Sequence, residues 1–181
     1  SIVKSPHIDR LASQGMLFNR AYCNVPVCGA SRASMMTGIL PTKTRFINHK
    51  TKVDEDTPNA MTMAQAFKEA GYTTLAHGKI LHTSSDAMER SWSQPVNNPD
   101  MSHLANLDPE SMKTVSKRGR GRFYERVEAA DNAYADGIVA EQAIANLRKL
   151  KEDGKPFFLA CGFIRPHLPF YAPKKYWDMY D

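Results

Sequence analysis

No hydrophobic run in the 181-residue sequence is long enough to cross a membrane. The longest, residues 157–164, falls far short of the roughly 20 apolar residues that a membrane-spanning helix needs. Residues 1–6 also lack the apolar core of a signal peptide, although a mature or truncated chain could have lost one. We therefore expect no membrane partner, and the cellular compartment stays open.

Cysteine is scarce, and three cysteines do not form a disulfide framework. Cys161 lies within an apolar run and is predicted to be a buried, unreactive thiol, and the same is predicted of Cys23. Cys28 differs because it lies just ahead of a predicted helix, whose first backbone N–H groups have no internal partner and favour an anion. A cysteine in that position tends to be reactive, so the prediction of function depends on Cys28.

Apolar periodicity and terminal residues predict helices and strands in alternation. The helices are expected over residues 7–14, 30–37, 62–70 and 136–151. The strands are expected over residues 16–21, 72–76 and 157–163, and the last is nearly all apolar, as in a strand buried on both faces. This alternation predicts an α/β fold with a mostly parallel central sheet flanked by helices.

Residues 83–131 do not fit that alternation, because they are polar and show little periodicity. A loop of this length is uncommon inside a compact domain and usually serves as a binding loop or a lid. We find no internal repeat and no sharp boundary. Residues 1–181 are therefore interpreted as one unit, with 83–131 as a long insertion.

In parallel α/β sheets, functional residues lie in the loops beyond the carboxyl ends of the strands. Lys79 and His82 follow the predicted strand 72–76, and His167 follows the strand 157–163. Each alone has a simpler interpretation, since a lysine after a strand is more often solvated and a histidine in a proline-rich loop more often structural. Together with the Cys28 helix they predict a single site.

Cys28 and Arg32 leave two other interpretations open. One is the loop of the cysteine phosphatases, in which five residues separate the cysteine from the arginine. Only three residues separate Cys28 from Arg32, so the spacing argues against it. The other is a structural cysteine before a helix that Ser31 caps. Three other histidines have no comparable neighbours in the sequence and are predicted to be structural or surface residues, namely His49, His77 and His103.

Several motifs in order resemble the type I sulfatase family. Cys28-Gly29-Ala30-Ser31-Arg32, followed by Thr37-Gly38, is similar to the family signature Cys-x-Pro/Ala-Ser-Arg-x-x-x-x-Thr-Gly. The Lys-x-x-His spacing and the Pro-His-Leu-Pro-Phe element resemble most closely the iduronate-2-sulfatase branch. Further segments that resemble the family in the same order are residues 5–12, 78–82, 157–160 and 165–170.

The resemblance implies an alkaline-phosphatase-like α/β fold and a sulfuric ester hydrolase that acts on a sulfated saccharide. It implies that a formylglycine-generating enzyme oxidises Cys28 to formylglycine, whose hydrated form attacks the sulfur atom. Arg32 would then hold the formylglycine hydroxyl and Lys79 the sulfate. His82 and His167 would move protons, one at the nucleophile and the other at the leaving alcohol, and the two roles could be exchanged.

Calcium is the metal that the resemblance implies, with formylglycine 28 as one ligand. The family's other ligands, an aspartate pair on the first strand and an Asp-His or Asp-Asn pair later, have no counterpart in this sequence. Family members are normally well over twice this length, and they occur in the periplasm, outside the cell or in the lysosome. We therefore expect the chain to be an internal segment that needs the rest of a sulfatase chain, and that alone binds metal poorly and hydrolyses little.

The basic run 117–122 and the net charge of +5 favour an acidic partner. Arg120 and Arg122 are predicted to contact a sulfated saccharide, because arginine forks bind sulfate and carboxylate well. A solvated loop and a nucleic-acid-binding segment are the alternatives. The latter usually repeats and interleaves aromatic residues, which this run does not. Among enzymes, the alternative is a phosphate or phosphonate monoester hydrolase of the same superfamily.

Overall fold

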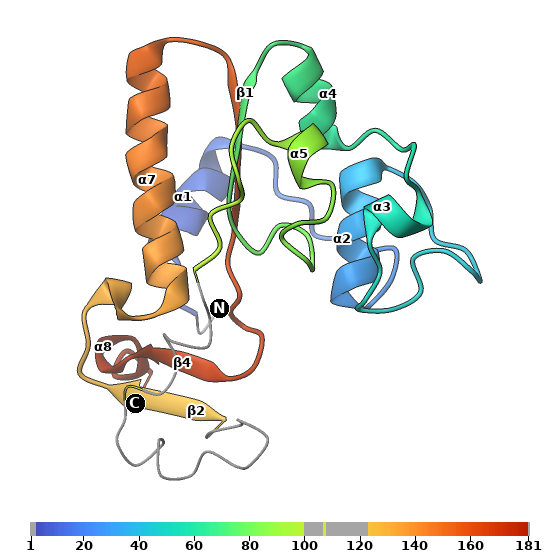
Figure 1. The fold of residues 1–181 in the computed structure, drawn as a ribbon. Coiled ribbons are helices and arrows are strands. Elements are labelled where there is room, and N and C mark those ends of the chain that lie inside the picture. The colour runs from blue at the N-terminus through green and yellow to red at the C-terminus, as the bar shows by residue number, and fades with distance from the viewer. Residues whose placement is uncertain (1–2, 100–106, 108–122, 181) are drawn as a thin grey trace.

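The computed structural model describes residues 3–99, 107 and 123–180 (Figure 1). The predicted saccharide contacts Arg120 and Arg122 lie outside the described residues, and so does His103. Within the described part, none of the helices has the length and apolar character needed to cross a bilayer.

Two parallel strand pairs organise the fold. β1 (Thr73–Gly78) pairs with β3 (Phe157–Gly162), and the register ends with Gly78 beside Gly162. β2 (Tyr124–Val127) pairs with β4 (Phe170–Pro173). The strands alternate with helices along the chain, so the predicted mixed α/β fold with parallel strands is confirmed.

Helices flank the β1–β3 pair. α7 (Ala135–Asp153) and α4 (Met63–Glu69) each contact both strands, and Figure 1 shows them on opposite sides. The predicted helices are confirmed within two residues at each end, and Thr62 caps α4 by accepting the N–H of Gln65 at 3.0 Å. The other elements of the described part are α1 (Pro6–Gln14), α2 (Cys28–Thr37), α3 (Val53–Asp56), α5 (Met88–Ser91), the 3₁₀ helix η1 (Asp131–Ala133) and α8 (Lys174–Trp177). α5 and β2 both fall inside the predicted insertion 83–131.

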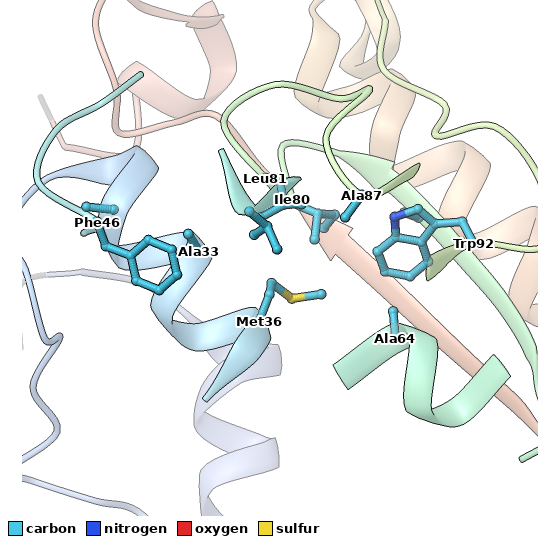
Figure 2. Close-up of a cluster of buried hydrophobic side chains, with 11 residues drawn as sticks. Ala33, Met36, Phe46, Ala64, Ile80, Leu81, Ala87 and Trp92 are labelled. Atoms are coloured by element: carbon cyan, nitrogen blue, oxygen red, sulfur yellow. The ribbon is translucent and has the colours of Figure 1, made fainter. Parts of the chain in front are cut away.

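A hydrophobic core joins α2 to the chain that follows β1 (Figure 2). Met36 of α2 lies beside Ile80 and Leu81, the buried residues just beyond β1. Phe46, which is fully buried, packs on the same helix. This packing fixes α2 relative to the carboxyl end of β1. The cluster also contains Ala30, Ala33, Val53, Ala64, Ala76, Ala87 and Trp92.

The strand predicted over residues 16–21 is wrong, because no strand forms there. Met16, Leu17 and Phe18 are exposed, and Phe18 keeps 72% of its surface in contact with solvent. A strand is stable only when a neighbour accepts its backbone hydrogen bonds and covers one of its faces. Among the described residues no strand pairs with this segment, so its β-favouring residues do not form a strand.

The burial predicted for β3 and for two cysteines is also wrong. Phe157 at the start of β3 is 37% exposed, and Cys161 and Cys23 are both exposed. In the described part of the chain α7 and α4 contact β3, but they leave side chains near both ends of its apolar run open to solvent. Desolvation, with a smaller contribution from Asp136, still raises the pKa of the Cys161 thiol. Cys161 is therefore exposed as a residue, but the surroundings of its sulfur atom favour the neutral thiol over the thiolate.

Two glycines allow the backbone at the end of β1 to approach the backbone at the end of β3 closely. Gly78 has φ +70°, and a Cβ at this residue would lie 2.2 Å from the carbonyl oxygen of Gly162. A Cβ at Gly162 would lie 2.1 Å from the carbonyl oxygen of Lys79. The N–H of Lys79 donates to the Gly162 carbonyl at 2.8 Å, which continues the ladder past the strand end. The chain around Lys79 is therefore held by backbone contacts that exclude any side chain.

Replacing Gly162 with alanine should lower the free energy of unfolding by about 1–3 kcal/mol, because the new methyl group would have to displace backbone. The measurement is urea unfolding followed by tryptophan fluorescence. Gly15→Ala is the matched control, since a Cβ there would meet its nearest atom at 3.5 Å, an ordinary contact. Equal stabilities of the two variants would contradict the close approach.

Candidate active site

Cys28 is the first residue of α2, so the helix starts two residues earlier than expected. The extended Val27 precedes it, and the N–H of Ser31 donates to the Val27 carbonyl at 2.9 Å. Ser31 therefore lies inside the first turn, and the prediction that it caps the helix is wrong. Arg32 lies one turn after Cys28 on the same face of the helix, where side chains at this spacing meet.

His82 contacts Cys28 across 54 positions of sequence. The Cys28 Sγ lies 3.4 Å from the His82 Nδ1, and both side chains are half-buried. His82 belongs to the chain segment beyond β1, so the contact joins the start of α2 to the carboxyl end of β1. The two strongest sequence motifs thus meet at one point.

Arg32 binds the same segment through its guanidinium group. Its Nη1 donates to the carbonyls of Lys79 at 2.5 Å and of Ile80 at 2.9 Å. Nη1 carries two protons, one for each of these bonds. Burial lowers the pKa of Arg32, and the proximity of Cys28 acts in the opposite direction. The guanidinium remains a cation, and the backbone carbonyls of Lys79 and Ile80 hold it in place.

The electrostatics of His82 show which side chains surround it. Burial is the largest cause of its lowered pKa, and Lys79, His49, Arg32 and His167 lower it further. These four neighbours are all basic side chains. The structure therefore brings Arg32, Lys79, His82 and His167 together. Such a cluster provides fixed positive charge for an anion.

The loop that carries His167 is held by α7. Asp136, in the first turn of that helix, accepts the backbone N–H groups of Ile164 and Arg165 at 2.8 and 2.9 Å. The His167 side chain is exposed, and its Nδ1 lies 2.7 Å from the carbonyl oxygen of Leu168. A carbonyl can only accept, so Nδ1 carries a proton and Nε2 is the atom available to substrate.

Sequence reasoning missed His49. Its ring lies edge-on to the ring of His82, with the centroids 5.7 Å apart. A Cβ on Gly29 would lie 2.2 Å from the carbonyl oxygen of His49, so the turn that bears His49 touches the helix that bears Cys28. The only sequence signal was a glycine beside Cys28, which does not say what approaches it. His77, by contrast, is buried and its Nε2 lies 2.9 Å from the Asn146 Nδ2, as a structural histidine would.

A cavity of about 370 Å³ opens beside Cys28 and Arg32. Its other walls come from the loop before α2 and from α2 itself, namely Cys23, Val25, Pro26, Val27, Ser31 and Met35. A second cavity of about 330 Å³ lies next to His77 and Asn146 and contains none of the clustered cations. The first cavity is therefore the one associated with the candidate site.

The described residues do not by themselves form a calcium site. Calcium takes six to eight oxygen ligands, usually from carboxylates and carbonyls. Within the described part of the chain, no three histidine, cysteine, aspartate or glutamate side chains are grouped so as to hold a metal ion. Cys28, the predicted ligand, has cationic neighbours instead.

A sulfatase family model matches residues 1–181. Iduronate 2-sulfatases from Mus musculus and Homo sapiens are 35% and 34% identical to the chain over 99% of its length. A sulfatase from Formosa agariphila is 31% identical, also over 99% of the chain. The chain covers 34% of each iduronate 2-sulfatase and 38% of the Formosa protein, so it spans about a third of the length of these relatives.

Removing the Asp136 carboxylate should loosen the His167 loop. In Asp136→Ala, hydrogen exchange at the amides of Ile164 and Arg165 should become about 10-fold faster, because each loses its acceptor. Asp153→Ala, at the other end of α7, is the matched control and should leave these two amides unchanged. Unaltered exchange in Asp136→Ala would show that the carboxylate does not hold the loop.

Proposed function

The chain belongs to the sulfatase family, and from this premise we propose that it forms the nucleophile-bearing part of an enzyme that removes sulfate from a sulfated saccharide. One observation carries the proposal. The signature cysteine, Cys28, contacts His82 at the edge of a cluster of cations that includes Arg32 and Lys79. Family membership supports hydrolysis of a sulfuric ester, and the cluster supports an anionic substrate.

Oxidation of Cys28 by a formylglycine-generating enzyme would supply a hydrated aldehyde, one hydroxyl of which can attack sulfur. The Cys28 Sγ stands where an oxygen of that hydrate would lie. The His82 Nδ1, 3.4 Å from this position, is placed to exchange a proton with it. Burial and the surrounding cations lower the pKa of His82 and so favour the neutral ring, which can accept that proton.

The remaining residues are assigned by charge and exposure. Sulfuryl transfer places negative charge on the sulfate oxygens and on the leaving oxygen, and a preorganised cation stabilises that charge without moving. Arg32 is fixed by hydrogen bonds to two carbonyls, one of which belongs to Lys79. We therefore assign binding of the sulfate group to Arg32 and Lys79. His167 lies at the exposed edge of the site and suits the leaving alcohol.

Other parts of the proposal concern groups outside the described residues. We assign calcium and most of its ligands to further segments of a sulfatase chain, with residue 28 as the ligand from this one. Arg120 and Arg122 are proposed to contact the saccharide. A phosphate or phosphonate monoester hydrolase remains the alternative, because a cluster of cations also binds a phosphate ester.

Conversion of Cys28 should be visible by mass. When the protein is made together with a formylglycine-generating enzyme, the peptide containing residue 28 should lose roughly 18 Da, the difference between a thiol-bearing carbon and an aldehyde. Intact-peptide mass spectrometry makes the measurement, with Cys28→Ala as the control that cannot convert. An unmodified thiol under these conditions would remove the proposed nucleophile.

Substrate class can be decided by rates on matched esters. We expect a full-length sulfatase that contains this chain, converted at residue 28, to hydrolyse 4-nitrophenyl sulfate faster than 4-nitrophenyl phosphate. Lys79→Ala should lower the sulfatase rate by about 10²–10³-fold, as removal of one preorganised donor does. The control is Lys155→Ala, because this lysine lies just before β3, at the strand end opposite the site. Faster phosphate hydrolysis would favour the alternative, and equal losses in the two variants would contradict the role of Lys79.

A further inference from the structure

His49 has a fixed position relative to the catalytic residues. Its ring meets the ring of His82 edge-on, at 5.7 Å between centroids and with 75° between the planes. His82 in turn contacts Cys28. The His49 ring is therefore separated from the nucleophile Cys28 by a single side chain, that of His82. In the sequence, His49 and Cys28 are 21 positions apart.

The turn that presents His49 is well ordered by its own hydrogen bonds. The N–H of Lys50 donates to the Asn48 Oδ1 at 2.8 Å, and the N–H of Thr51 donates to the Asn48 carbonyl at 3.3 Å. Before the turn, the fully buried Phe46 donates its N–H to the Asp56 Oδ2 at 2.8 Å. The backbone on both sides of His49 is thus fixed, and the ring projects from a preorganised turn.

Gly29 gives the turn access to the helix that begins at Cys28. A Cβ on Gly29 would overlap the His49 carbonyl oxygen at 2.2 Å and would lie 2.9 Å from that of Asn48. With any other residue at 29, the turn would have to move away from α2. The absence of a side chain at this position is therefore what brings His49 into the site.

Exposure separates the site into two levels. Cys28, Arg32, Lys79 and His82 are half-buried, whereas His49 and His167 are exposed. The proposed function places the sulfate among the half-buried groups. The rest of the substrate must then extend toward solvent, past the exposed histidines.

We propose that His49 binds the saccharide part of the substrate by contacting a second anionic group, a carboxylate or another sulfate, close to the sulfate that is removed. This inference rests on the proposed function. Its support is the position of the ring at the exposed edge of the site, with Lys50 exposed beside it. An imidazole N–H and an ammonium can both donate to an oxyanion, and arrangement on an ordered turn lowers the entropy lost on binding.

Three probes test the inference: a monosulfated hexose glycoside, the same sugar with a second sulfate, and the corresponding monosulfated uronic acid glycoside. In the full chain, His49→Gln should lower kcat/KM for a probe with a second anion by about 10-fold, mainly through KM, and by about 2-fold for the monosulfated hexose. The two anionic probes distinguish sulfate from carboxylate. Equal losses on all three would overturn the inference.

Two further variants keep the test decisive. His49→Lys retains a positive charge and should restore most of the preference for the second anion, which a purely structural role of the ring would not allow. His7→Gln, which removes an exposed histidine on α1, should leave the preference unchanged. Loss of the preference in His7→Gln, or no recovery in His49→Lys, would contradict a direct contact.

A binding measurement separates this inference from the proposed function. In Cys28→Ala, which cannot turn over, titration calorimetry with the disulfated probe and with the sulfated uronic acid should show tighter binding than with the monosulfated hexose. Adding His49→Gln should remove the difference. This result would support the His49 contact even if no sulfate ester were hydrolysed, and a difference that persists without His49 would overturn it.

Discussion

The guanidinium of Arg32 is the interaction on which the site depends. By donating to the carbonyls of Lys79 and Ile80, it fastens α2 to the chain beyond β1. The Cys28–His82 contact lies between the same two segments, so its geometry follows from that attachment. Met36 of α2 and Leu81 beyond β1 are buried in the same apolar cluster, which excludes water between these two segments. Both bonds come from the single nitrogen Nη1, so the guanidinium retains further N–H donors on its other two nitrogens, which a lysine would not supply.

The same arrangement carries an electrostatic cost. Burial lowers the pKa values of both Arg32 and His82, and the neighbouring basic side chains lower that of His82 further. Stability must come from elsewhere, namely from the backbone acceptors of Arg32 and from the apolar cluster around α2. A bound oxyanion would offset the repulsion, and the concentration of perturbed groups in one place is typical of functional sites.

The sequence was most informative where structure is local. Thr62 and the apolar face of α4 gave that helix, and the run at β3 gave its strand, because caps and periodicity act over a few residues. Burial was predicted less well, since it depends on neighbours that composition does not name. Phe18 and Cys161 are apolar in pattern yet exposed, in a chain that spans about a third of the length of its relatives. His49 was missed for the same reason, because its contact with His82 arises from a turn far from both motifs.

The side chains grouped at the candidate site are basic. They form an anion-binding cluster on a rigid frame, but carboxylates that would bind a divalent cation do not group with it in the described ranges. Under the proposed function, binding of a sulfate ester and activation of the nucleophile would therefore depend on different groups. The positions of these side chains are fixed by hydrogen bonds among α2, the chain beyond β1, the loop after β3 and α7. A metal would add acidity at residue 28, where the present structure provides a contact with His82 and no negative charge to hold the ion.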